Sequence, residues 1–225
     1  MQSTDKKENT PKRIALVTGA TGLTGKYLLR MLYQTKKYSK IIVFTRKPLD
    51  IIFENLEEII VDFDELPNNV FANDIYCCLG TTIKNAGTKE AFRKVDYEYV
   101  VNLANKMKDA GAENFAVISA MGASKKSLFF YSRVKGEMEE TVSKIGFNAT
   151  YIFRPSLIAG TRKEKRNGEK LAIQIFAAVN PLLIGPLAKY QSVSPQAIAK
   201  AMIVKMIESE KGFHIIKSDE IKNIF

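Results

Sequence analysis

Short, continuously apolar runs recur along the first two thirds of the chain, with amphipathic stretches between them. The runs are Ile14–Val17, Ile41–Phe44, Ile59–Val61, Ile75–Leu79, Phe115–Ser119 and Thr150–Phe153. Runs of this length are typical of strands buried on both faces of a parallel sheet. The stretches 88–110 and 132–145, and the segment after the first run, carry apolar residues at helical spacing. This alternation predicts an α/β fold with a doubly wound parallel sheet and right-handed crossovers.

The chain has 225 residues, which fits one large domain. Residues 1–11 are polar and predict a disordered tail, so we expect a single domain over 12–225. The sharpest change in composition is TRKEKRNGEK at 161–170, with five basic and two acidic residues, which indicates an exposed loop. Apolar helical segments follow it, and we therefore expect 161–225 to contribute a small C-terminal lobe on the substrate side of the sheet.

Charge and rare residues narrow the chemistry. Lys and Arg number 34 against 24 Asp and Glu, and the net charge of +10 favours anionic partners without specifying one. The single histidine, His214, excludes a multi-histidine metal site and a Ser-His-Asp triad, so we expect no metal. Adjacent Cys77 and Cys78 are too few for a disulfide framework and indicate a reducing compartment.

Neither the N-terminus nor the interior shows a targeting or spanning segment. The first 13 residues are polar and lack an apolar signal core. The longest apolar stretch, Leu171–Ala188, is interrupted by Gln174, Asn180 and two prolines, which makes it a poor membrane span. We expect a soluble, cytoplasmic protein.

A glycine-rich turn follows the first apolar run. Gly19, Gly22 and Gly25 form G-x-x-G-x-x-G between a predicted strand and a predicted helix. Such a turn lets bare backbone approach a pyrophosphate, and the helix N-terminus adds free N–H groups and a favourable dipole. In this strand–turn–helix context the motif predicts a dinucleotide site, the alternative being a glycine turn without a ligand.

The end of the second run indicates which dinucleotide binds. An NAD site usually has a carboxylate about 20 residues after the glycines, to hold the ribose hydroxyls. Here Arg46 and Lys47 stand at that place, and no acid lies beside them. A guanidinium suits a 2′-phosphate, so we predict NADP(H); the alternative is that both residues are solvated surface charges.

Tyr131 and Lys135 form Y-x-x-x-K on a predicted helix, twelve residues after Ser119. Residues i and i+4 share a helix face, so the phenol and the ammonium point the same way. A nearby ammonium stabilises a phenolate, which makes Tyr131 a usable proton donor to a carbonyl that receives hydride. Lys135 can also hold the ribose of the cofactor. The alternative is an outward-facing helical pair.

Taken together, these motifs resemble the short-chain dehydrogenase/reductase superfamily, and most closely its atypical branch of Tat-interacting-protein-like NADPH-binding oxidoreductases. The resemblance runs from about Ile14 to Glu169. It rests on TGATGLTG at 18–25, CCLGTT at 77–82, FRKVDYEYV at 92–100, SAMGA at 119–123, FYSRVKGE at 130–137, FRPS at 153–156 and RKEKRNGE at 162–169.

The resemblance implies a Rossmann fold with NADP(H) across the strand ends. By motif, the implied diphosphate contacts are Thr21, Gly22, Leu23 and Thr24, and the adenosine phosphate contacts are Arg46 and Lys47. Leu79 and Gly80 would lie beside the cofactor, and Lys135 would bind the nicotinamide ribose. Ile158 and Arg166 are further implied cofactor contacts, for which the resemblance is weaker.

One departure concerns the end of the fifth strand. The superfamily often has two serines there, the second of which polarises the substrate carbonyl; here the pair is Ser119-Ala120. Neighbouring strand residues face opposite ways, so Ser119 does not simply replace the missing serine. Losing such a donor typically costs about 100–1,000-fold in rate.

The main hypothesis is an NADPH-dependent oxidoreductase that reduces a small carbonyl compound, with Tyr131, Lys135 and Ser119 as the catalytic set. The rival is a non-catalytic NADP(H)-binding sensor or regulatory protein, which Ala120 favours. For the basic loop 162–170 the alternatives are a solvated loop, closure over the cofactor, or peripheral contact with an anionic membrane; nucleic acid ranks last. Monomer and homodimer stay open.

Overall fold

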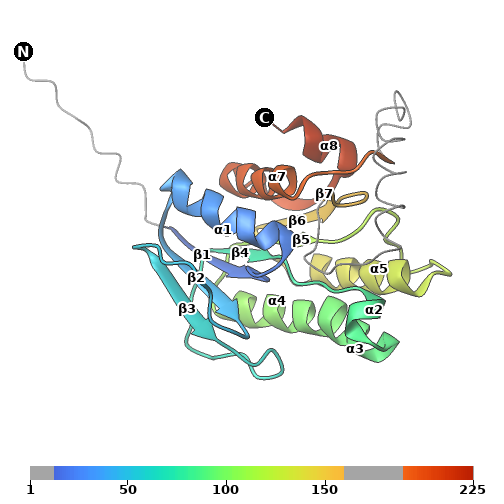
Figure 1. Ribbon diagram of the computed structural model, residues 1–225, viewed down its shortest axis with the longest axis horizontal. Coiled ribbons are helices and arrows are strands. Elements are labelled where there is room, and N and C mark those ends of the chain that lie inside the picture. The colour runs from blue at the N-terminus through green and yellow to red at the C-terminus, as the bar shows by residue number, and fades with distance from the viewer. Residues whose placement is uncertain (1–12, 160–189, 225) are drawn as a thin grey trace, which may run out of the picture.

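The computed structural model describes residues 13–159 and 190–224 (Figure 1). Seven parallel strands form one sheet in the order β3-β2-β1-β4-β5-β6-β7. Their bounds are β1 Arg13–Thr18, β2 Tyr38–Thr45, β3 Leu56–Ile60, β4 Asp74–Cys77, β5 Asn114–Ile118, β6 Ala149–Arg154 and β7 Gly212–Lys217. The strand order reverses direction after β3, which makes this the doubly wound Rossmann-type sheet that the apolar runs predict.

Helices cover both faces of the sheet (Figure 1). One face carries α1 (Leu23–Thr35), α7 (Pro195–Glu208) and α8 (Ser218–Asn223); the other carries α4 (Tyr99–Asp109) and α5 (Phe130–Ser143). Successive strand residues belong to the hydrophobic cores on opposite faces of the sheet. Ala15 and Val17 pack with α1 and α7, whereas Leu16 packs with α4 and α5. This alternation explains why the strands read as continuous apolar runs.

The described C-terminal residues are joined closely to the main sheet. Among the described residues of that segment, α7 packs against α1 and β7 pairs in parallel with β6, from Ala149↔Gly212 to Arg154↔Lys217. The half-exposed strand GFHIIK thus completes the main sheet, and the contribution of 161–225 to a small lobe on the substrate side stays a prediction. The expectations for residues 1–11 and for the basic loop lie outside the described residues.

The predicted helix over 88–110 is broken into three parts. These are α3 (Lys89–Arg93), a π-helical turn η1 (Lys94–Glu98) and α4; the short helix α2 (Ile83–Ala86) precedes them. A π turn inserts one extra residue into the helical repeat and is often found at functional sites. It lies over the carboxyl end of the sheet, where it brings Asp96 into the interior.

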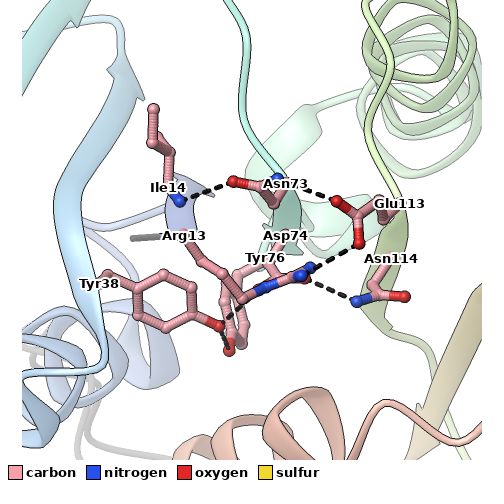
Figure 2. Close-up of polar contacts among 8 residues, drawn as sticks. All are labelled: Arg13, Ile14, Tyr38, Asn73, Asp74, Tyr76, Glu113 and Asn114. Carbon is pink, nitrogen blue, oxygen red and sulfur yellow. Dashed lines mark hydrogen bonds and ion pairs between the residues drawn. The ribbon is translucent and has the colours of Figure 1, made fainter. Parts of the chain in front are cut away.

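A polar network ties together the opposite, amino ends of four strands (Figure 2). The carboxylate of Asp74, which is completely buried, accepts two hydrogen bonds from Arg13 at 2.7 and 2.8 Å and one from Tyr38 at 2.9 Å. Asn114 donates to the same carboxylate at 2.8 Å, and the hydroxyls of Tyr38 and Tyr76 lie 2.8 Å apart. Because these residues come from β1, β2, β4 and β5, the network fixes the strands at the edge away from the glycine turn.

Candidate functional site

The glycine turn connects β1 to α1 at the carboxyl edge of the sheet. Gly19 has φ +72°, and a Cβ there would lie 2.4 Å from the carbonyl oxygen of Cys78. A Cβ at Gly25 would lie 2.1 Å from the carbonyl oxygen of Gly19. Gly22 is the N-cap of α1 and has no side-chain cap. The turn therefore requires glycine at 19 and 25, and it leaves the first N–H groups of α1 available to an anion.

A cavity of about 360 Å³ opens in front of this turn. It is lined by Gly19–Gly22, by Phe44–Arg46 at the end of β2, by Cys78–Thr81 after β4, and by Phe63, Asn85, Ala86, Ala91, Val95 and Tyr99. The structure thus brings together Gly19, Thr21, Gly22, Arg46, Leu79 and Gly80 from the predicted set. Leu23, Thr24, Gly25 and Lys47 are not part of the lining, because the first three lie in α1 and the fourth is exposed beyond Arg46.

The charge that lines this cavity is positive. Among the described lining residues Arg46 is the only charged side chain, and none is a carboxylate. Arg46 is exposed directly after β2, and Phe44, two residues earlier, also lines the cavity. A guanidinium without a carboxylate beside it suits a phosphate better than a pair of ribose hydroxyls.

Lys135 lies directly behind the cavity wall, in an ion pair with Asp96. The Lys135 Nζ to Asp96 Oδ1 distance is 2.7 Å, and the side chains are 4% and 1% exposed. The second oxygen of Asp96 accepts a hydrogen bond from Thr81 N at 2.8 Å. A Cβ at Gly80 would lie 3.4 Å from Asp96 Oδ1 and 3.8 Å from Lys135 Nζ. The bare backbone of Gly80 therefore separates the ion pair from the space that the cavity offers.

Burial alone would lower the pKa of Lys135, but the charge of Asp96, followed by the phenol of Tyr131, outweighs it and raises that pKa above its usual value. The ammonium is thus kept charged in a place with little water. Tyr131 and Lys135 both belong to α5, and their i, i+4 spacing places them on the same face of that helix.

Asp96 was missed as a functional residue, since an aspartate at that point is equally typical of a helix start. A signal was nevertheless present. Asp96 lies on the apolar stripe that continues through Phe92, Val100 and Leu103, all of them completely buried. A carboxylate on a buried helix face needs a cationic partner.

Tyr131 stands in the first turn of α5, with 36% of its surface exposed. Its ring packs against Phe92, with centroids 5.4 Å apart. The helix approaches the preceding loop closely, since a Cβ at Gly136 would lie 2.2 Å from the carbonyl carbon of Ser124. Tyr131 is therefore held by a rigid helix and remains partly exposed, but neither it nor Lys135 belongs to the residues that line the cavity.

Ser119, just after β5, is buried, and its hydroxyl donates to Glu139 of α5. Glu139 is in turn paired with Arg154 at the end of β6. The catalytic role of Ser119 stays a prediction, because a hydroxyl that donates to Glu139 has only its lone pairs left for a substrate. Ala120 supplies no hydroxyl at the neighbouring position.

Neither of the two weaker predicted cofactor contacts, Ile158 and Arg166, is among the described residues that line the cavity. Ile158 is half-buried and forms an isolated parallel bridge with Val193, outside the cavity lining. Arg166 lies outside the described residues. Within 13–159 and 190–224, no group of three or more His, Cys, Asp or Glu is arranged to hold a metal ion. No helix in that part of the chain is both long and apolar enough to cross a bilayer.

The fold and the glycine turn define a nucleotide-binding protein of the short-chain dehydrogenase type. The chain belongs to the NAD dependent epimerase/dehydratase family, which it matches over residues 15–211. This match, together with the similarity to a Tat-interacting-protein relative, confirms the atypical branch that the motifs resemble.

Among known proteins, the chain is 33% identical to "Protein HTATIP2" of Rattus norvegicus over 203 residues, covering 87% of this chain and 82% of that protein. It is 26% identical to "Protein FMP52, mitochondrial" of Debaryomyces hansenii over 227 residues, covering 92% and 99%. The fungal name carries a location that differs from the cytoplasmic location expected from the sequence.

Solved structures share the fold at low identity. The human epimerase family protein SDR39U1 with NADPH has a TM-score of 0.61 and 16% identity, over 89% of this chain and 72% of that one. MoeE5 in complex with UDP-glucose and NAD has a TM-score of 0.67 and 14% identity, over 92% and 79%. These two neighbours hold different dinucleotides, so the choice of cofactor in this chain depends on its own residues.

Proposed function

We propose that this chain binds NADP(H) and reduces a small carbonyl compound. The observation that carries the proposal is the cavity in front of the glycine turn, in which Arg46 is the one charged lining residue among those described. The glycine turn suits a diphosphate, because it lines the cavity with bare backbone and leads directly into the N-terminus of α1, which has no side-chain cap. The NADPH in the SDR39U1 structure supports the proposal by analogy of fold.

The binding steps follow from the geometry. The N–H groups at the start of α1 would hold the diphosphate, and Arg46 would bind the 2′-phosphate. Lys135, fixed by Asp96 behind Gly80, would hold the nicotinamide ribose. Leu23, Thr24, Gly25 and Lys47 stay secondary contacts in this proposal, as do Ile158 and Arg166.

NADPH, when bound, supplies hydride to the carbonyl carbon of the substrate. Tyr131 would donate its phenolic proton to the carbonyl oxygen as negative charge develops there. The ammonium of Lys135 would favour the resulting phenolate, and its own charge is maintained by Asp96. Phe92 would keep the Tyr131 ring in place during this transfer.

The test is NADPH oxidation with a panel of aldehydes and ketones, comparing wild type with Tyr131→Phe. Loss of the general acid should lower kcat by about 100-fold or more. Tyr27→Phe is the matched control, because Tyr27 is also 36% exposed but belongs to α1, whereas Tyr131 shares α5 with Lys135. A Tyr131→Phe variant that oxidises NADPH at the wild-type rate would remove this tyrosine from the proposed chemistry.

A second candidate function is a non-catalytic NADP(H)-responsive sensor. The observation that favours it is the end of β5, where Ser119 donates to Glu139 and Ala120 has no hydroxyl. NADPH binding with no turnover across the panel would establish this alternative. The single-domain organisation over 12–225, the cytoplasmic location and the small-molecule substrate remain parts of the proposal.

A further inference from the structure

Two large apolar side chains stand where the preceding loop enters α5, with Phe129 as the N-cap of that helix. Leu128 is 95% exposed and Phe129 is 78% exposed. Apolar residues exposed singly are normal on a protein surface, whereas these two adjacent side chains form one small exposed apolar patch. We refer to Leu128 and Phe129 as the apolar tip.

The loop that carries the apolar tip is held in place by its own hydrogen bonds. Ser127 N donates to Ser124 O at 2.9 Å, and Phe129 N donates to the Ser127 hydroxyl at 3.2 Å. The guanidinium of Arg133 donates to the carbonyl oxygens of Ser127 at 3.0 Å and Leu128 at 3.4 Å. Arg133 N also donates to Phe129 O at 2.9 Å. The exposure of the tip is therefore built into the fold.

This bonding pattern suits contact with an apolar phase. A backbone group that enters lipid without a hydrogen-bond partner costs several kcal/mol. The carbonyl oxygens of Ser127, Leu128 and Phe129 are already satisfied within the protein. These three carbonyl oxygens can thus leave water without losing their hydrogen bonds.

Positive charge surrounds the apolar tip. Lys125 and Lys126 are both exposed in the same loop, and Lys89 Nζ lies 5.5 Å from the centroid of the Phe130 ring at its base. Lys125 is paired with Glu140 at 2.6 Å, whereas Lys126 has no carboxylate partner among the described residues. The whole chain carries +10. Apolar side chains flanked by lysines match a surface of acyl chains covered by anionic headgroups.

We propose that the apolar tip and Lys126 dock this protein onto an anionic lipid bilayer. Leu128 and Phe129 would enter the boundary between headgroups and acyl chains, and Lys126 would remain among the headgroups. A lipid surface fits better than a protein partner, because two side chains fall far short of the roughly 1,200 Å² that a stable protein interface buries. The proposal does not depend on the proposed catalytic function.

The absence of tryptophan from the chain makes the tip easy to probe. Phe129→Trp introduces a single reporter, to be mixed with phosphatidylcholine vesicles with and without phosphatidylserine. We expect a blue-shifted emission and flotation with the anionic vesicles. Ile52→Trp is the matched control, since Ile52 is 96% exposed in a different loop, and its emission should not shift.

Loss-of-binding variants complete the test on the otherwise native chain. Leu128→Ser with Phe129→Ser should lower vesicle affinity by about tenfold or more, because insertion scales with buried apolar area. Lys126→Gln should lower it by about fivefold, the effect of one charge near an anionic surface. Ile52→Ser should change nothing, and an unchanged Tm would show that each variant folds.

Four results would overturn the proposal. The wild type could fail to float with phosphatidylserine vesicles, or the double serine variant could float as well as the wild type. A blue shift that depends on protein concentration without lipid would assign the tip to a second copy of the chain. A shift caused by a small apolar carbonyl compound in the absence of vesicles would assign it to the substrate site.

Discussion

At the scale of single residues, Lys135 and Asp96 are both more than nine-tenths buried and lie 2.7 Å apart. Removing one member of such a pair leaves an uncompensated charge in the interior, and this costs more than the pair itself contributes. Thr81 N also donates to Asp96, so the carboxylate joins the turn after β4 to α5 through Lys135. Its position behind Gly80 makes it a positioning residue for the proposed ribose contact.

We predict that Asp96→Ala lowers the free energy of unfolding by roughly 3–5 kcal/mol at neutral pH. The pKa of Lys135 is raised in the fold, so its stabilising contribution is complete below the unfolded pKa of about 10.5 and is lost as pH rises through the higher folded pKa. The difference between wild type and variant should therefore narrow in alkaline solution. Urea unfolding at pH 7 and 11 measures both effects.

Asp64→Ala is the control for this prediction. Asp64 pairs with Lys94 at 2.8 Å, but both side chains are about half exposed, 52% and 44%. Such a surface pair contributes about 1 kcal/mol or less. A loss at Asp96→Ala as small as that at Asp64→Ala would contradict the importance that we assign to the buried pair.

At the scale of elements, the carboxyl ends and the amino ends of the strands have different roles. The carboxyl edge carries the glycine turn, the cavity and the Asp96–Lys135 pair. The amino ends of the strands carry the network around Asp74 (Figure 2). None of the residues of this network lines the cavity of the candidate site. Ligands of open α/β sheets bind at the carboxyl ends of strands, so the amino-edge network serves stability.

This network predicts a loss of stability in alkaline solution. Burial, and after it the neighbouring charges, raises the pKa values of Tyr38 and Tyr76 above the usual value near 10. The unfolded chain then releases protons above pH 10 that the fold retains, and stability falls as pH rises. Each such tyrosine contributes up to about 1.4 kcal/mol per pH unit.

Tyr76→Phe should therefore flatten the decline of unfolding free energy between pH 10 and 11.5, measured by urea titration. At neutral pH the same variant should lose only about 1 kcal/mol, the net value of the hydrogen bond between the two hydroxyls. Tyr27→Phe, at an exposed tyrosine, should leave the profile as it is in the wild type. An alkaline slope of Tyr76→Phe that equals the wild-type slope would refute this reading of the network.

At the scale of the whole molecule, most of the sheet can be predicted from the sequence. Strands buried on both faces give continuous apolar runs, and six of the seven strands overlap runs of that kind. Strand β7 has no such run, since its sequence GFHIIK places His214 between apolar residues; Phe213 is 43% exposed, whereas Ile216 is 7% exposed. The π turn escaped prediction for a different reason, since one added helical residue changes the period without a characteristic residue type.

The candidate site divides in the same way. The glycine turn and Arg46 are predictable, because backbone proximity and phosphate charge demand particular residue types at fixed spacing. The partner of Ser119 is not, because Glu139 lies 20 residues away and meets it only after α5 has packed on the sheet. The same holds for Asp96 and Lys135, which the tertiary fold brings together from η1 and α5.

The most direct measurement is isothermal calorimetry of NADPH and NADH with ligand-stripped wild type, Arg46→Ala and Lys47→Ala. We predict that NADPH binds the wild type with measurable heat. Arg46→Ala should weaken NADPH about tenfold or more, the value of a hydrogen bond to a charged group, with little change for NADH. Lys47→Ala should lose less, because Lys47 is outside the cavity lining. No heat with either dinucleotide, or equal losses of NADPH and NADH in Arg46→Ala, would contradict the account.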